Sequence, residues 1–251
     1  MARIALISDI HGNLEALIAV LREIDAAGVD HLLCLGDVVG YGPDPGPCVD
    51  LVSRVCDKII VGNHDEAALV EDTPANFNPT AALSLNLTRS LLTDSQLETI
   101  AEWPMRDELG GVQIAHASFG PRMYAYVMNK RLASESFKGL DDGIGAFGHT
   151  HLPAMFACPD GEEPDANNIR GSLPMPADVM TTLPTDHKVL LNPGSVGQPR
   201  DRNPDASWGL LDTTERTFRT HRASYDIDAT EKKIRDRGLP DFLHERLRVG
   251  A

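Results

Sequence analysis

The first sixty residues alternate between extended and helical patterns, and this alternation constrains the fold more than any other feature of the sequence. Arg3–Ile7 is a short apolar run of β type, and in Leu14–Ala27 the apolar side chains recur at helical spacing. Asn13 is a suitable N-cap for this helix, and Gly28 is a suitable stop. The elements expected next are a strand, a helix and a strand, at residues 31–35, 48–55 and 58–61. A β-α-β-α-β order predicts parallel strands with right-handed crossovers and helices packed over the sheet.

The rest of the chain indicates more strands, arranged in a less regular way. Asn78 and Pro79 are typical of a helix start, and Thr93 with Gln96 forms a capping box for another helix. Further strands are expected at residues 112–115, 145–147, 188–191 and 209–211. The later strands resemble hairpins, so we expect mixed sheets. Residues 162–186 contain four prolines and little periodicity, which predicts a long surface loop within a single α/β domain that spans residues 1–251.

The charge balance excludes several kinds of partner. The 37 acidic and 23 basic side chains give a net charge of −14, which disfavours binding to nucleic acid or to an anionic membrane surface. The chain shows no run of apolar residues long enough to cross a bilayer, and its first residues lack the features of a secretory signal. We therefore expect a cytoplasmic protein. The oligomeric state stays open.

The four cysteines fit a reducing compartment. They show no C-x-x-C spacing, and Cys34 lies in an apolar run where it would pack as a small hydrophobic side chain. We therefore interpret Cys34, Cys48, Cys56 and Cys158 as reduced structural thiols and not as nucleophiles.

Polar side chains follow five of the expected strands at the point where each strand ends. These segments contain Asp9, His11, Asp37, Asn63, His64, Asp65, His116, His149 and His151. In open α/β sheets the carboxyl ends of the strands form the ligand-binding edge, so the five segments are expected to meet in one crevice. Gly36, Gly62 and Gly148 each precede a polar residue and would let the backbone approach a bound group closely.

The donor atoms in this set are oxygens and imidazole nitrogens without sulfur, which suits Mn²⁺, Fe, Ni²⁺ or Zn²⁺. One carboxylate can bridge two ions that lie about 3.5 to 4 Å apart. Two divalent ions, two aspartates and a bridging hydroxide leave a single positive charge. Such a centre would attract an anionic phosphoryl group and activate the water that attacks it.

Each segment alone has a simpler interpretation. An Asp-x-His sequence is more often a surface turn, Gly-Asp a tight turn, Asn63 a helix cap and His116 a hydrogen-bonded core histidine. The complete set favours a functional site over these simpler interpretations, because five of the nine histidines fall at strand ends. The other four are given no functional role: His31, His187, His221 and His244.

The ordered motifs resemble the calcineurin-like metallophosphoesterase family. They are D-x-H at 9–11, G-D-x-x-G at 36–40, G-N-H-D at 62–65, the single His116, and G-H-x-H at 148–151. The sequence N-P-G-S-V at 192–196 is also similar to the small bacterial and archaeal phosphodiesterase branch. The resemblance implies a two-sheet mixed β sandwich flanked by helices, the four-layer fold of that family.

The resemblance also implies a role for each motif residue. Asp9, His11 and His151 would hold the first metal, and Asn63, His116 and His149 the second. Asp37 would bridge the two ions, with Mn²⁺ expected first. His64 would be the general acid for the leaving group; its alternative is a plain loop histidine.

The motifs depart from the Ser/Thr phosphatase branch, which has G-D-x-V-D-R-G as its second block and usually G-N-H-E as its third. Gly40, Tyr41 and Asp65 stand at the differing positions. Arg122, Arg200 or Arg202 would be a possible phosphate clamp, but a solvated surface position is favoured for each.

The function we expect is hydrolysis of a small phosphodiester or related phosphorylated metabolite, by attack of a metal-activated hydroxide. The alternatives are a Ser/Thr protein phosphatase, a dinucleoside polyphosphate hydrolase, and a metal-binding scaffold without turnover. The substrate and the native metal pair stay open. The resemblance does not assign a role to the 162–186 segment.

Overall fold

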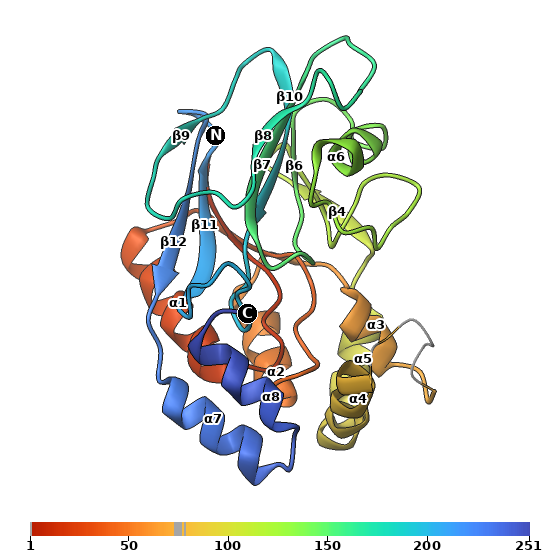
Figure 1. Cartoon of the computed structure of the whole chain (residues 1–251), viewed down its shortest axis with the longest axis vertical. Helices are drawn as coiled ribbons and strands as arrows, with labels where there is room; N and C mark the ends of the chain where they lie inside the picture. Colours follow the sequence, from red (N-terminus) through yellow and green to blue (C-terminus); the bar gives the residue numbers. More distant parts are fainter. Residues whose placement is uncertain (1, 73–76, 78) are drawn as a thin grey trace.

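The computed structural model describes residues 2–72, 77 and 79–251. In this part of the chain two mixed six-stranded sheets pack face to face (Figure 1). In spatial order, the first sheet consists of β3 (Lys58–Ile59), β2 (His31–Cys34), β1 (Arg3–Ile7), β11 (Ala206–Asp212), β12 (Thr217–Ala223) and β9 (Thr181–Thr182). The second consists of β4 (Arg106–Leu109), β5 (Val112–Ala115), β6 (Ile144–Ala146), β10 (His187–Pro193), β7 (Pro153–Pro159) and β8 (Arg170–Ser172).

Parallel and antiparallel strands are segregated within each sheet. Strands β1, β2 and β3 are parallel, and β11, β12 and β9 extend this sheet antiparallel to them or to each other. In the second sheet β5, β6 and β10 are parallel, while β4, β7 and β8 pair antiparallel. Parallel strands need long crossovers, and the crossovers from β1 to β2, from β2 to β3 and from β5 to β6 each carry one helix.

Helices flank the two sheets in the described part of the chain. They are α1 (Leu14–Ala27), α2 (Pro45–Val55), α3 (Asn63–Ala68), α4 (Pro79–Leu91), α5 (Asp94–Ala101), α6 (Lys130–Phe137), α7 (Ile227–Asp236) and α8 (Asp241–Glu245), followed by the 3₁₀ turn η1 (Arg246–Arg248). Helices α3, α4 and α5 gather at one corner of the molecule, and α7 and α8 lie together beside α1 (Figure 1). No helix of the described residues is both long and apolar enough to span a membrane.

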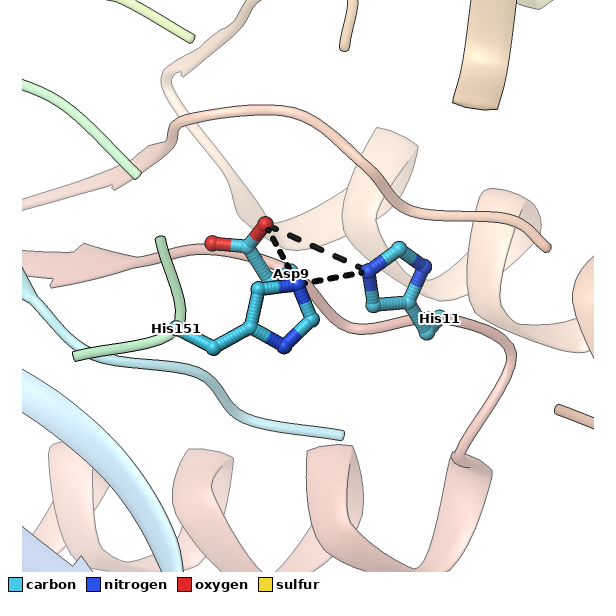
Figure 2. A group of neighbouring side chains, drawn as sticks. All are labelled: Asp9, His11 and His151. Carbon is cyan, nitrogen blue, oxygen red and sulfur yellow. Dashed lines mark hydrogen bonds and ion pairs between the residues drawn. The ribbon is translucent and has the colours of Figure 1, made fainter. Parts of the chain in front are cut away.

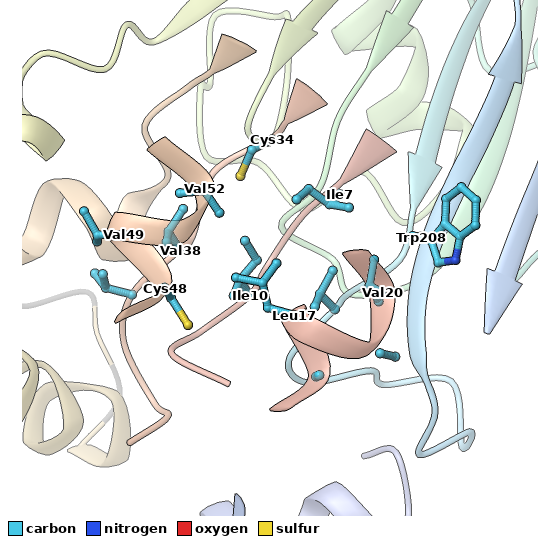
Figure 3. Close-up of a cluster of buried hydrophobic side chains, with 14 of the residues drawn as sticks. Ile7, Ile10, Leu17, Val20, Cys34, Val38, Cys48, Val49, Val52 and Trp208 are labelled. Carbon is cyan, nitrogen blue, oxygen red and sulfur yellow. The ribbon is translucent and has the colours of Figure 1, made fainter. Parts of the chain in front are cut away.

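Strand β1 shows how the layers are built. Its side chains alternate between two buried faces, as expected for a strand in the middle of a four-layer fold. Ala5 and Ile7 pack with helices α1 and α2 in the cluster that Figure 3 displays. Ile4 and Leu6 point the other way and pack against the second sheet. Sheet-to-sheet packing thus fixes how the strand ends of the two sheets are positioned relative to each other.

Most elements expected from the pattern are present, with shifted ends. The helix expected at 48–55 begins earlier, at Pro45, because a proline is well suited to the first turn. The helix expected from Pro79 runs to Leu91, and Asn78 lies outside the described residues. Asn13 and Gly28 cap α1 as expected: the Asn13 side chain accepts from the Ala16 N–H, and Gly28 adopts φ +65°.

The segment at residues 162–186 is more than a surface loop. Arg170–Ser172 pairs with β7 at the edge of one sheet, and Thr181–Thr182 pairs with β12 at the edge of the other. The segment therefore crosses from one sheet to the other and covers an edge of each. Strands this short have no recognisable sequence pattern, and only the tertiary pairing creates them.

Candidate active site

The residues expected at the strand ends do meet in space. Asp9 and His11 follow β1, Asp37 follows β2, and His116 follows β5. His149 and His151 follow β6, and Asn63 begins α3. The two aspartates and the five histidines of this set, His64 included, are all at most 5% exposed. A concentration of ionisable groups at this depth requires a ligand or a shared proton to compensate its charge.

The backbone at these positions is unusual. Asp9, His11, Asp37, His149 and His151 all adopt φ between +49° and +65°. Left-handed backbone is uncommon for residues other than glycine and costs about 1 to 3 kcal/mol each. Five such residues in one site are therefore maintained by the surrounding fold, a distribution typical of functional sites.

Asp9, His11 and His151 form the first group of ligand atoms (Figure 2). The Nε2 atoms of the two histidines are 3.2 Å apart, and Oδ1 of Asp9 is 3.4 Å from Nε2 of His151. The Nδ1 atom of His11 faces the Val39 carbonyl at 3.0 Å, and that of His151 faces the Gln198 carbonyl at 2.6 Å. Each Nδ1 therefore carries the proton, so that two Nε2 lone pairs and a carboxylate oxygen face one another. A cation at this point removes their mutual repulsion.

Asp37 connects the first group to a second one. Its Oδ2 atom lies 3.7 Å from Nε2 of His11 and 3.3 Å from Nε2 of His116. Asp37, His116 and His149 form a further group whose ligand atoms lie within 4.8 Å of one another. His116 is oriented like the other histidines, because its Nδ1 faces the Leu35 carbonyl at 2.7 Å. One carboxylate thus stands between two sets of imidazole ligands.

Burial controls the protonation of these imidazoles. It lowers the pKa of His11 and of His151 well below the usual range, and it lowers the pKa of His149 to about 3. His116 is the exception: burial acts to lower its pKa, but the carboxylate of Asp37 outweighs this effect and raises the pKa to about 9. The imidazoles of His11, His149 and His151 are therefore neutral at pH 7, the form that can bind a metal ion. His116 would have to release its proton before it could bind a metal ion.

Besides Nε2 of His116, which lies 3.3 Å from Oδ2 of Asp37, two buried candidate ligand atoms have no hydrogen-bond partner among the described residues: Oδ1 of Asn63 and Nε2 of His149. Buried polar atoms are rarely left unsatisfied in native proteins unless an ion or water completes them. Both residues line the same pocket beside the second group. The oxygen and nitrogen donors of the two groups therefore fit a pair of divalent metal ions.

Two of the three glycines before polar residues illustrate the close packing at the site. A Cβ atom on Gly62 would lie 2.2 Å from Oδ1 of Asp37, and one on Gly148 would lie 1.8 Å from Oγ of Ser8. A larger residue at either position would displace Asp37 or the loop that carries Asp9. The absence of a side chain is therefore needed to bring the strand ends together.

His64 lies beside the two ligand groups, and its side chain forms a third group with His11 and Asp37 whose ligand atoms lie within 4.8 Å of one another. Its backbone N–H donates to Oδ1 of Asp37 at 2.8 Å, and its buried Nδ1 has no partner among the described residues. Its ring makes an edge contact with His11, with centroids 4.8 Å apart, and packs against Tyr41. Burial lowers the pKa of His64 to about 4.

A pocket of about 120 Å³ opens over the second group. His64, His149, Asn63 and Ala81 form part of its lining, and four aromatic side chains complete it: Tyr41, Phe77, Tyr124 and Tyr126. Three of the four tyrosines in the chain are thus concentrated here. Tyr126 stacks on the ring of His149, with centroids 4.0 Å apart. Tyr124 and Tyr126 were not predicted from the sequence, because both lie in an irregular segment without periodicity.

The three arginines considered as a phosphate clamp differ in their surroundings. Arg122 is exposed and pairs with Glu135, and Arg202 is also exposed. Arg200 is half-buried, and its backbone N–H donates to the His151 carbonyl at 3.3 Å. Only Arg200 of the three therefore adjoins a metal-ligand candidate.

The remaining histidines and the cysteines lie apart from the ligand groups. His31, His187, His221 and His244 each approach an aspartate, namely Asp57, Asp186, Asp178 and Asp241. The cysteines are free thiols; Cys34, Cys48 and Cys158 are buried and Cys56 is half-buried. Burial raises the pKa of the Cys34 thiol, which makes it a poor nucleophile.

The sequence matches a known protein family over most of its length. Residues 2–216 match the calcineurin-like phosphoesterase superfamily domain. An uncharacterized protein of Methanocaldococcus jannaschii is 32% identical over 98% of both chains. The phosphodiesterase YfcE of Escherichia coli is 27% identical over 84% of this chain and 88% of its own.

Among solved structures, a metallophosphoesterase from Sphaerobacter thermophilus superposes with a TM-score of 0.86. It shares 34% identity, and the superposition covers 99% of both chains. The two-sheet fold expected from the motif resemblance is thereby confirmed. The chain belongs to the calcineurin-like phosphoesterase superfamily, whose members are metal-dependent phosphoester hydrolases.

Proposed function

We propose that this protein hydrolyses small phosphodiesters at a two-metal centre. The observation that carries the proposal is the position of Asp37, whose Oδ2 lies between Nε2 of His11 and Nε2 of His116. Asp9, His11 and His151 would hold one ion. Asn63, His116 and His149 would hold the other, with Asp37 as the shared ligand.

The residues fit such a pair on chemical grounds. The ligands combine two carboxylates and an amide oxygen with four imidazoles, a set suited to Mn²⁺, with Fe, Ni²⁺ or Zn²⁺ as alternatives. When bound, the ions would supply positive charge to the phosphoryl group and activate the attacking water. Because only two ligands carry negative charge, the occupied centre would keep a net positive charge and attract an anion.

The chain's own residues would orient the substrate and move the proton. His64 lines the pocket next to Asp37, and its imidazole would face a phosphoryl or leaving-group oxygen bound there. The lowered pKa of His64 makes its imidazole neutral at pH 7, and an approaching anion would favour the protonated form. His64 would then act as the general acid for the departing alkoxide.

The pocket favours an ester with an organic group on each side of the phosphorus. A diester presents two such groups, and the wall of Tyr41, Tyr124 and Tyr126 offers one of them a planar apolar surface. The printed name of the YfcE relative, a phosphodiesterase, supports the same class. The net charge of −14 acts against long nucleic acids, because their further phosphates would be repelled outside the pocket.

Turnover measurements on the full chain loaded with Mn²⁺ test the proposal. The substrates are bis-p-nitrophenyl phosphate, p-nitrophenyl phosphate, diadenosine tetraphosphate and a phosphoserine peptide. We expect the highest kcat/KM for the diester and no turnover after chelation. A tenfold preference for the peptide or for diadenosine tetraphosphate would replace the diester with that substrate class. Two bound ions without turnover of any substrate would identify a metal-binding scaffold.

A further inference from the structure

Two arginines meet beside the first metal-ligand group. Arg200 lies in the loop after β10, and Arg246 begins the 3₁₀ turn η1; both are half-buried. Nη2 of Arg200 and Nη1 of Arg246 donate to the same atom, Oε1 of Gln198, at 3.3 and 3.1 Å. Two positive charges therefore converge on one neutral oxygen.

Neither guanidinium has a carboxylate side chain within ion-pair distance in the described part of the chain. Other arginines do have such partners: Arg122, Arg131, Arg222, Arg235, Arg237 and Arg248. The Nε atom of Arg200 is buried without any hydrogen-bond partner, and that of Arg246 donates to the main-chain oxygen of Ala251. Burial and the charge of Arg200 lower the pKa of Arg246 to about 10.

This arrangement is unfavourable unless an anion completes it. Like charges in a partly buried site repel each other, and each half-buried guanidinium loses hydration without an acidic side chain to compensate its charge. The chain contains 37 acidic side chains that could have served as such a partner. An anion that accepts hydrogen bonds from both guanidinium groups would compensate both charges.

The arginine pair is coupled to the metal-ligand site through the backbone. Gln198 accepts hydrogen bonds from both guanidinium groups on its side chain. Its backbone carbonyl also accepts the Nδ1 proton of His151. Tyr41 makes an edge contact with His11, and its pKa is influenced by both Arg200 and Arg246. The two arginines therefore lie on the Tyr41 side of the first ligand group.

We propose that Arg200 and Arg246 form an anion-binding subsite that holds a phosphoryl group of the substrate beside Asp9, His11 and His151. This inference rests on the proposed function, since it takes the substrate to be a phosphate ester. The group held is either the phosphoryl that is attacked or a second phosphoryl of the same molecule. Both have the same chemistry, and the substrates below distinguish them.

Binding without turnover provides the first test. The full chain, freed of metal with a chelator, is heated at rising concentrations of inorganic phosphate, with sodium chloride to match ionic strength. A ligand that binds only the folded state raises the unfolding midpoint. We expect phosphate to raise the unfolding midpoint of the native sequence. R200Q and R246Q should bind phosphate roughly tenfold more weakly, because each loses a charged hydrogen bond. R202Q is the matched control, because Arg202 is exposed and only two residues from Arg200.

The variant R246K separates a loss of the subsite from a loss of folding. Lysine keeps the charge but lacks the planar fork, so we expect intermediate phosphate binding and an unfolding midpoint near that of the native protein. Equal stabilisation by phosphate in R200Q, R246Q and R202Q would overturn the proposal. So would the absence of any phosphate effect on the native sequence.

Turnover of two related esters identifies which phosphoryl group is held. Thymidine 5′-(p-nitrophenyl phosphate) has one phosphate, and its 3′-phosphorylated form has a second. If R246Q lowers kcat/KM about tenfold for both, the subsite holds the attacked phosphoryl; if only the 3′-phosphorylated ester is affected, it holds the second one. Equal kcat/KM for R246Q and R202Q on both esters would contradict the subsite. A Mn²⁺-loaded protein that binds phosphate but cleaves neither ester would refute the proposed function and leave the subsite intact.

Discussion

The backbone N–H of His64 donates to Oδ1 of Asp37 at 2.8 Å, while the other oxygen of the same carboxylate faces His116 and His11. Asp37 therefore does two things at once. It fixes the start of the helix that carries His64, and it links the imidazoles of the two ligand groups. These contributions can be separated, because an amide side chain can still accept the N–H of His64 but has no negative charge.

For Asp37→Asn we expect loss of metal with retention of the fold. The amide oxygen replaces the hydrogen-bond acceptor, but the shared anionic ligand is gone, so affinity for both ions should fall at least tenfold. His151→Asn should weaken one ion only. Metal analysis by mass spectrometry after gel filtration measures both variants. Two tightly bound ions and normal turnover in Asp37→Asn would exclude the bridging role.

For His64→Ala we expect both ions to remain and turnover to fall by roughly 10² to 10⁴, the usual contribution of a general acid. The loss should be smaller for p-nitrophenyl esters than for alkyl esters, because p-nitrophenolate needs little protonation to leave. Comparison of kcat for the two ester types measures this difference. An equal fall in kcat for both ester types would assign His64 to phosphate binding alone. His31→Ala is the control, because His31 is remote from the site.

For Asp65→Ala we expect a stability defect. The buried carboxylate of Asp65 accepts the N–H groups of Val38 and Val39 and also that of Gly62, all between 2.9 and 3.0 Å. Removing it leaves three buried donors unsatisfied, which should lower the free energy of unfolding by about 3 kcal/mol or more. Urea unfolding measures this, with the exposed Glu66→Ala as control. A change within 1 kcal/mol would mean that water replaces the carboxylate.

The convergence of these candidate side chains was predictable from the sequence, because each of them is local to the end of a strand. Asp9, Asp37 and His116 each follow a run whose period identifies it as a strand, and the parallel order brings such ends to one edge. The left-handed backbone at Asp9 and Asp37 was not predictable, since it depends on loops that hydrogen-bond across the edge: the Asp9 N–H donates to the Gly36 carbonyl.

Other features depend on tertiary contacts that leave no local pattern. Strand β7 begins and ends with proline, which hides its extended character in the sequence, and β8 and β9 exist only through their pairing partners. Arg246 was not predicted from the sequence as a site residue for a similar reason. It lies in a short 3₁₀ turn, and only the folded chain brings it to Gln198, 48 positions away.

Tyr126 should contribute to binding of planar groups. Its ring stacks on His149 yet is 48% exposed, so one face contacts the ligand group while the rest is available to substrate. Tyr126→Ala should raise KM for bis-p-nitrophenyl phosphate several-fold with little change in metal content, because ring stacking contributes about 0.5 to 1.5 kcal/mol. Met128→Ala, exposed in the same segment, is the control. An identical KM in both variants would remove the tyrosine from the substrate surface.

His221 offers a pH-dependent signal far from the metal ligands. Its ring stacks on Trp208 with centroids 4.4 Å apart, and its Nδ1 lies 3.3 Å from Oδ1 of Asp178. Burial, assisted by Arg219, lowers the pKa of His221 below the usual 6.5 despite Asp178. The unfolded chain therefore takes up this proton more readily than the folded one. Its contribution to stability is complete above pH 6.5 and is lost as the pH falls below that value.

Fluorescence of Trp208 reports this titration directly, because an imidazolium quenches indole emission more strongly than a neutral imidazole. In a Trp103→Phe background, which leaves Trp208 as the remaining tryptophan, we expect quenching with a midpoint below pH 6.5. His221→Gln should abolish the step and flatten the fall in unfolding midpoint on acidification. A midpoint at or above pH 6.5 would show that the ion pair with Asp178 outweighs burial, and the stability contribution of His221 would then be greatest in acid and lost as the pH rises.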